Sequence, residues 1–191
     1  MRTSWPRFGE AQRSAGAGEQ KIDLALEVAR KAEANEQHDR AIDAWKSVQR
    51  IEPKHEEARE ALKRLYRKAE KWNALAEMLK LEADACGPEL RDRKLGLLRE
   101  LVAVYRDNLR LDAMVATTYN AIAELAPEDD DAVDRLITTY EQMGRWNDLV
   151  QALTKKAEQT AGPEKVTILM RVAKLWIDRF ANFNKATEPL E

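Results

Sequence analysis

The chain has 191 residues, 44% of them apolar, which is enough to build a hydrophobic core. Charged residues make up 35% and aromatic residues 6%, with 7 Gly and 6 Pro, a composition poor in strand-forming and hairpin-forming residues that predicts an all-α protein. The 32 Lys+Arg and 34 Asp+Glu nearly cancel, which argues against a protein that wraps nucleic acid by bulk charge.

The cysteine content and the hydropathy further limit the class of protein to which this chain can belong. Cys86 is the only cysteine, so an intrachain disulfide framework and a cysteine-rich metal site are both excluded. The sequence has no unbroken apolar run of 18 residues and no signal sequence at its start. We therefore expect a cytoplasmic protein that does not insert into a membrane.

The first segment, residues 1–20, contains three glycines and a proline and shows no helical period. It is predicted to be an N-terminal tail. Trp5 and Phe8 are costly to leave in water, so they are the candidate anchors through which this tail would dock on a partner. The region 21–191 is predicted to form a single helical array.

From Lys21 onward, apolar residues recur at helical spacing and fall into pairs of helices of about 34 residues. Proline cannot continue a helix, so Pro53, Pro88, Pro127 and Pro163 mark the ends of four pairs, and a fifth pair follows. The expected core positions are Ile22, Ala25, Ala29 and Ala32; Ala41, Trp45, Val48 and Ile51; Ala58, Leu62, Leu65 and Tyr66; Leu75, Leu79, Ala83 and Cys86; Leu98, Leu101, Val102 and Tyr105; Val115, Tyr119 and Ile122; Val133, Leu136, Ile137 and Tyr140; Leu149, Leu153 and Ala157; and Leu169, Val172, Ala173 and Trp176.

A tetrapeptide occurs twice, as Trp72-Asn73-Ala74-Leu75 and Trp146-Asn147-Asp148-Leu149, at an offset of 146 − 72 = 74 residues. An internal repeat of this length indicates an array of stacked units and favours binding over catalysis. The offset exceeds two units of about 34 residues, so extra residues are expected in the middle hairpin, near 90–94 and 106–111. Each copy is expected to begin the second helix of a hairpin, with Asn73 or Asn147 as the cap; Asp39 is a further expected cap.

These positions resemble the tetratricopeptide repeat (TPR) family, whose unit is two helices in about 34 residues. The resemblance rests on Ala41, Trp45 and Pro53; on Leu101, Tyr105, Tyr119 and Pro127; on Leu136, Tyr140 and Gly144; and on Leu169, Trp176 and Ala186. It implies a right-handed α-solenoid of antiparallel helical hairpins, with about four complete units and a partial fifth. The central repeats are degenerate, because the family's close-contact glycine is replaced by Ala29, Lys63, Val102, Ile137 and Ala173.

The sequence offers no constellation that predicts catalysis. The two histidines, His38 and His55, are expected in exposed turns and show no metal-ligand spacing, and Cys86 lies on an apolar face without an activating partner. The acidic run 128–131 is expected to place negative charge at a helix N-terminus rather than to bind calcium. We expect no enzyme activity, no metal and no cofactor.

The resemblance implies that the first helix of each hairpin lines a concave groove. The outward positions of these helices are basic in the middle of the chain and acidic toward its end. They comprise Arg30, Glu60, Arg64, Arg67, Lys68, Arg99 and Arg106, followed by Asp134 and Glu141. Arginine favours carboxylates and phosphates, which predicts an acidic or C-terminal-carboxylate peptide as the ligand. The alternative is a solvated helix face with ion pairs such as Glu60 with Arg64.

The leading functional hypothesis is a non-catalytic protein–protein interaction scaffold or adaptor that holds a peptide or a partner helix in this groove. A second hypothesis is a structural subunit that docks through its N-terminal tail or its open C-terminal repeat. A third is a helical-repeat module that binds RNA through the central arginines, although nucleic acid and small-molecule substrates are not the expected partners.

Overall fold

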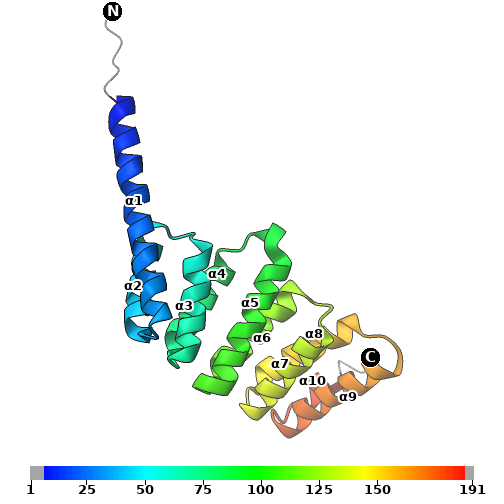
Figure 1. Cartoon of the computed structure of the whole chain (residues 1–191). Helices are drawn as coiled ribbons and strands as arrows, with labels where there is room; N and C mark the ends of the chain where they lie inside the picture. The colour runs from blue at the N-terminus through cyan, green and yellow to red at the C-terminus, as the bar shows by residue number, and fades with distance from the viewer. Residues whose placement is uncertain (1–6, 188–191) are drawn as a thin grey trace, which may run out of the picture. The chain divides into compact units, whose positions relative to one another are not determined.

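The computed structural model describes residues 7–187, with side chains from residue 20 onward, and in this part of the chain every regular element is helical. Figure 1 shows the helices following one another along the chain. The elements are α1 (Arg7–Ala34), α2 (His38–Ile51), α3 (Glu56–Lys68), α4 (Trp72–Asp84), the short 3₁₀ helix η1 (Pro88–Leu90), α5 (Arg91–Ala103), the π-helix η2 (Val104–Leu109), α6 (Asp112–Leu125), α7 (Asp130–Gln142), α8 (Trp146–Gln159), α9 (Gly162–Asp178) and α10 (Phe183–Thr187).

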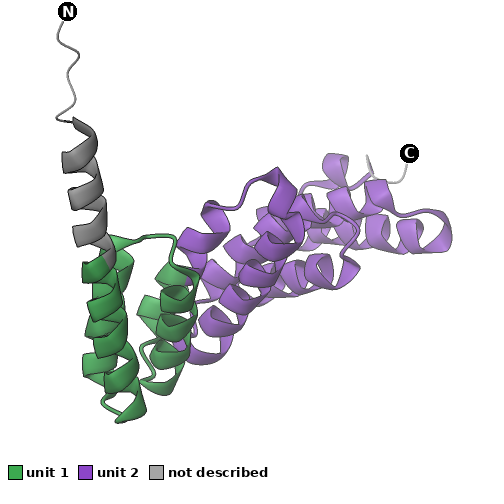
Figure 2. Ribbon diagram, turned by 45° about the horizontal axis from the view of Figure 1, so that its top comes forward, with its two compact units in different colours: residues 1–78 green, residues 79–191 purple. Residues whose placement is uncertain are grey.

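The chain divides into two compact units, residues 1–78 and 79–191, with the division inside α4 (Figure 2). In unit 1, α1 packs on α2 and α2 on α3. In unit 2, each helix from α5 to α10 packs on the next one in the chain. Because the connections are only a few residues long, consecutive helices lie antiparallel as helical hairpins. The predicted architecture of helical hairpins is confirmed.

The cores consist of the apolar positions that recur at helical spacing. In unit 1, Trp45 and Leu62 are 1% and 0% exposed, and in unit 2, Ile122 and Leu149 are both 0% exposed. Most of the expected core positions are buried, whereas Ile51 is 42% exposed. It is the last residue of α2.

The turn between the two helices of every hairpin contains one residue in the left-handed conformation. These residues are Glu36, Glu70, Arg110, Gly144 and Ala181, with φ between 49° and 67°. Glycine adopts this conformation without steric cost, and only the fourth turn uses it.

Backbone hydrogen bonds close the first, second and fourth of these turns in the same way. The residue after the left-handed position donates its N–H to a carbonyl five residues earlier: Gln37 to Ala32 at 3.0 Å, Lys71 to Tyr66 at 2.9 Å and Arg145 to Tyr140 at 2.9 Å. This is the Schellman arrangement, which satisfies carbonyl groups at the end of a helix. The three turns are therefore one repeated structural unit.

The third turn contains one additional residue. There the N–H of Leu111 donates to the carbonyl of Tyr105, six residues earlier, at 3.0 Å, and the intervening segment is the π-helix η2. The left-handed residues lie 70 − 36 = 34, 110 − 70 = 40, 144 − 110 = 34 and 181 − 144 = 37 residues apart. The expectation that the middle hairpin is lengthened is confirmed, with η1 marking its entry and η2 its turn.

One helix cap matches expectation and two others do not. Asp129 caps α7 by accepting a hydrogen bond from the Ala132 N–H at 3.1 Å, so the acidic run does serve a helix N-terminus. Asn147 is the second residue of α8 and does not cap it, because Arg145 occupies the cap position without a side-chain bond. Asp39 is likewise the second residue of α2, and its carboxylate pairs with Lys71 at 2.7 Å.

The predicted boundary between tail and array at residue 20 differs from the observed helix, because α1 already begins at Arg7. Residues 7–20 are rich in Ala, Glu, Gln and Arg, and this propensity outweighs the cost of about 1 kcal/mol for each glycine. Trp5 lies outside the described residues and the side chain of Phe8 is not described, so their role as anchors stays a prediction.

Candidate functional site

Two of the predicted groove arginines lie in unit 1, where each joins α1 to α3. Arg30 of α1 forms two hydrogen bonds with Glu57 of α3, from Nε to Oε1 at 2.8 Å and from Nη2 to Oε2 at 2.6 Å. Arg64 of α3 donates from Nε to Oε1 of Glu33 of α1 at 3.0 Å. These guanidinium groups are thus engaged with carboxylates of the neighbouring first helix, and the pKa of Glu57 is lowered chiefly by the bond from Arg30.

Glu33 also receives a hydrogen bond from the indole Nε1 of the buried Trp45, at 3.2 Å. Its carboxylate therefore connects α1, α2 and α3. The other predicted residues of this unit lie on α3: Glu60 pairs with the buried Lys63 at 2.6 Å, and the exposed Arg67 and Lys68 occupy the last turn. Positive charge at a helix C-terminus is stabilising in itself.

Arg99 and Arg106 lie in unit 2 and line the same hollow. Arg99 of α5 donates from Nη2 to Oδ2 of Asp129 at 2.7 Å, and this bond is the main reason that the pKa of Asp129 is lowered. Arg106 of η2 bonds to its sequence neighbour Asp107, from Nε to Oδ1 at 2.7 Å and from Nη2 to Oδ2 at 2.9 Å. This pairing raises the pKa of Arg106 and lowers that of Asp107.

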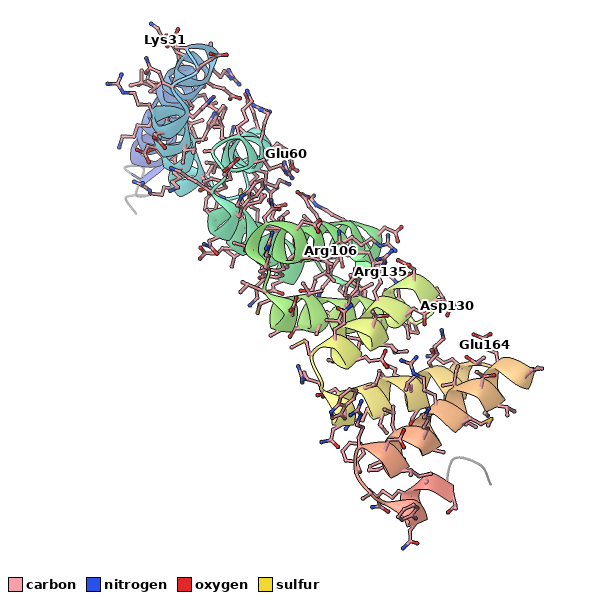
Figure 3. All side chains as sticks on the ribbon, turned by 90° about the horizontal axis from the view of Figure 1, so that it is seen from below. Lys31, Glu60, Arg106, Asp130, Arg135 and Glu164 are labelled. Carbon is pink, nitrogen blue, oxygen red and sulfur yellow. The ribbon has the colours of Figure 1, made fainter. Side chains whose placement is uncertain are left out.

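Two hollows, of about 120 and 250 Å³, adjoin at Arg106 and Tyr119, which line both. The first lies between α5, η2, α6 and the start of α7, and the second between η2, α6 and α7. We call the two hollows together the η2 groove. In Figure 3, Arg106 and Arg135 lie beside each other on one side of the molecule. The other lining residues are Arg99, Val102, Ala103, Asp112, Val115, Ile122, Asp129, Asp131, Ala132, Thr138, Thr139 and Gln142.

Tyr119 and Arg135 of this groove were not among the predicted site residues. Tyr119 was predicted only as a core aromatic of a second helix; it is 7% exposed, and its remaining surface faces the groove. Arg135 is the sequence neighbour of the predicted Asp134, and it pairs with Asp131 at 2.8 Å. Arg135 lies beside Arg106 because of the direction in which the π-helix η2 turns the Arg106 side chain, and residue spacing in the sequence does not reveal this direction.

The acidic residues expected near the end of the groove are also paired. Asp134 bonds to Lys156 of α8 at 2.5 Å, and Glu141 bonds to Arg171 of α9 at 2.8 Å. Ion pairs with α8 and α9 therefore balance both acidic positions. A separate hollow of about 230 Å³ lies between α6, α7 and α8, with Asn120, Gln151 and Lys155 on its walls.

His55 and Cys86 form structural contacts, whereas Nδ1 of His38 is buried without a hydrogen-bond partner in the described part of the chain. His55 is half-buried rather than exposed and caps α3, because its Nδ1 accepts the N–H of Ala58 at 3.2 Å. The Cys86 thiol donates to the carbonyl of Glu82 at 3.2 Å. Among the residues that the structure describes, no group of three His, Cys, Asp or Glu is placed to hold a metal ion. No described helix is long and apolar enough to cross a membrane.

No protein-family model and no curated protein matches the sequence. Among solved structures, the chain is similar to MamA from Desulfovibrio magneticus RS-1, at 15% identity and a TM-score of 0.41 over 89% of this chain and 91% of that one. It is also similar to YrrB, described as a TPR protein with an unusual peptide-binding site, at 14% identity and a TM-score of 0.42 over 94% of this chain and 88% of that one.

The chain's own helical hairpins decide the assignment, since they repeat the same turn and the same buried positions. The chain is an all-α array of antiparallel helical hairpins. Its degenerate positions are filled by larger residues that remain in the core: Val102 and Ile137 are 3% and 4% exposed, and Lys63 is 6% exposed with its ammonium group on Glu60.

Proposed function

We propose that this TPR-like chain is a non-catalytic interaction scaffold that binds a peptide or partner helix in the η2 groove of unit 2. The observation that carries the proposal is the groove itself: guanidinium groups from η2 and α7 flank a largely buried tyrosine in an open depression. Arginine and tyrosine are enriched where proteins bind one another, because each combines a large contact area with fixed hydrogen-bonding groups.

The groove favours a peptide that carries carboxylates. Of the predicted candidates, Arg99 and Arg106 belong to it, whereas Arg30, Glu60, Arg64, Arg67 and Lys68 lie in unit 1 and serve its helix contacts or helix ends. Because carboxylates already accompany the arginines, a partner that brings both signs of charge or a few acidic residues fits better than a uniformly anionic polymer such as RNA.

Selection from a random peptide library displayed on phage tests this function. We expect enrichment of peptides with acidic residues, whose binding weakens in the double variant Arg106→Gln/Arg135→Gln and persists in the matched control Arg145→Gln. Arg145 is a suitable control because it forms a similarly exposed local pair with Asp148 at 2.8 Å. Failure to enrich any peptide, or equal binding by the groove variant, would contradict the proposal.

A second candidate function is assembly through the last hairpin. Val166, Met170 and Ile177 of α9 and Phe183 of α10 are 55%, 60%, 43% and 67% exposed. The three α9 residues share one face at helical spacing, and exposed apolar patches of this kind mark interaction surfaces. Replacing Val166 and Met170 by Gln should lower the mass measured by light scattering if this face mediates self-association; an unchanged mass would remove that form of assembly.

A further inference from the structure

The third hairpin turn, which adjoins the η2 groove, has one residue more than the first, second and fourth turns, and the fifth turn shares this length, because the N–H of Asn182 donates to the carbonyl of Trp176. In the second and fourth turns, the left-handed residue lies four positions after the tyrosine that accepts the closing hydrogen bond: Glu70 after Tyr66 and Gly144 after Tyr140. In the third turn, Arg110 lies five positions after Tyr105. The additional residue is accommodated in the π-helix η2, and π-helical turns occur frequently at functional sites.

This widened turn places Arg106 above Tyr119. The two residues line both hollows, and the phenol of Tyr119 contributes to raising the pKa of Arg106. Arg135 of α7 lines the second hollow together with Arg106 and Tyr119. The hydrogen bond to Asp131 raises the pKa of Arg135, and the nearby charge of Arg106 acts weakly against this rise. Two like charges held side by side over a tyrosine hydroxyl form a binding place for an anionic group.

The carboxylate of Asp107 occupies one edge of Arg106, and Asp131 accepts from Nε of Arg135. These bonds use Nε and Nη2 of Arg106 and Nε of Arg135, so Nη1 of Arg106 and both terminal nitrogens of Arg135 are not used by the two carboxylates. Asp107 and Asp131 are 55% and 74% exposed, and ion pairs this accessible contribute little stability. An incoming carboxylate can therefore replace either one at small cost.

We propose that Arg106 and Arg135, set by the inserted residue of η2, form a subsite for one carboxylate of a partner peptide, and that Asp107 is its internal competitor. The proposal rests on the function assigned to the η2 groove and specifies which atoms hold the acidic group. Tyr119 supplies the hydroxyl at the floor of the subsite. Asp107 holds Arg106 in its bound orientation while no ligand is present and yields to the ligand's carboxylate.

Removing Asp107 should therefore strengthen binding, which a structural role would not do. The probe is a fluorescein-labelled hexaglutamate peptide, titrated against the full chain at low ionic strength and followed by fluorescence anisotropy, with hexaglutamine as the uncharged control. Asp107→Asn should tighten binding by roughly two- to fivefold, the range that loss of one exposed ion pair allows. Arg106→Gln and Arg135→Gln should each weaken it by about tenfold, the loss expected for a charge-assisted hydrogen bond.

Asp148→Asn is the matched control, because it makes the same change in net charge and removes the partner of the exposed Arg145. Its affinity should equal that of the unmodified chain. If Asp107→Asn and Asp148→Asn tighten binding equally, the effect arises from the net charge of the chain and the subsite is overturned. The subsite is also overturned if the unmodified chain shows no detectable binding of hexaglutamate. If library-selected peptides still bind the η2 groove in either case, only the subsite fails and the proposed function stands.

Deleting Asn108 tests the role of the inserted residue. It gives the third turn the length of the second and fourth, and we expect hexaglutamate affinity to fall to the level of Arg106→Gln. Circular dichroism establishes that the deletion variant remains helical. A folded deletion variant with unchanged affinity would show that the insertion does not position Arg106, and a variant that does not fold leaves Asp107→Asn as the deciding measurement.

Discussion

The carboxylate of Asp129 joins two elements of unit 2: its Oδ2 accepts a hydrogen bond from Arg99 of α5 at 2.7 Å, and its Oδ1 accepts one from the Ala132 N–H at 3.1 Å. One side chain thus caps α7 and connects it to the preceding first helix. We predict that Asp129→Ala lowers the free energy of unfolding by about 1–2 kcal/mol, because it removes both contacts. Asp129→Asn keeps an acceptor for the cap and should lose less; chemical denaturation measures both, and equal losses would contradict the dual role.

Acid should weaken the ion pairs that join the first helices of neighbouring hairpins. The pKa values of Asp129 and Glu57 are lowered, chiefly by hydrogen bonds from Arg99 and Arg30. A lowered folded-state pKa contributes stability above the unfolded pKa of about 4 and loses it as the pH falls through the folded value. We therefore expect the Tm to be nearly constant from about pH 7 to 5 and to fall below about pH 4.

The double variant Asp129→Asn/Glu57→Gln should have a lower Tm at neutral pH and a shallower decline in acid. Glu158→Gln, which alters an exposed carboxylate on α8, serves as the control and should follow the unmodified chain. Parallel acid profiles for the double variant and the unmodified chain would show that other groups cause the pH dependence.

The left-handed position of the hairpin turns should favour glycine, so a substitution that introduces glycine and one that removes it should change the stability in opposite directions. Glu36→Gly is expected to stabilise the protein by up to about 1 kcal/mol, because φ is 54° there and glycine adopts this value without a Cβ clash. Gly144→Ala should destabilise it by about 1 kcal/mol, since a Cβ would meet only the Trp146 ring, at 3.8 Å or more, and strain at φ 67° is the remaining cost. Thermal unfolding of the two variants measures the difference, and shifts of the same sign would contradict it.

Trp45 is the largest fully buried side chain, at 1% exposed, and its indole also bonds to Glu33. Trp45→Ala should cost unit 1 about 3–5 kcal/mol, because it removes a large apolar surface and leaves a cavity. Hydrogen exchange read by mass spectrometry should show faster exchange in α1, α2 and α3 than in α7 and α8. Equal acceleration in all five helices would indicate that the two units unfold as one.

The hairpins and most core positions could be predicted from the sequence because both depend on spacing within one helix. Leu62, Leu136 and Leu149 sit at helical periods and are buried as expected. Capping was less predictable: Asn147 and Asp39 have suitable side chains but lie one residue inside their helices. The start of α1 at Arg7 could not be predicted, because the glycines of residues 7–20 disfavour a helix while the residues around them favour one, and composition alone does not show which effect is larger.

The candidate site could be predicted only in part. Arg99 and Arg106 could be placed on the outward side of a first helix, but their counter-ions, Asp129 and Asp107, depend on where the next helix begins and on the course of η2. Spacing could locate the extra residues of the third hairpin, yet it could not show that they form a π-helix. The contribution of Tyr119 to the groove could not be predicted, because it depends on how α5, η2 and α7 surround the tyrosine.

Chemical-shift mapping with a library-selected acidic peptide tests the central claim most directly. With uniformly ¹⁵N-labelled protein, the largest changes should fall on the backbone N–H groups of Arg99, Arg106, Tyr119, Arg135 and Thr138, which line the η2 groove, and on the side-chain N–H groups of the three arginines. Changes centred instead on Asn120, Gln151 and Lys155, which line the separate hollow between α6, α7 and α8, would contradict the η2 groove as the binding surface.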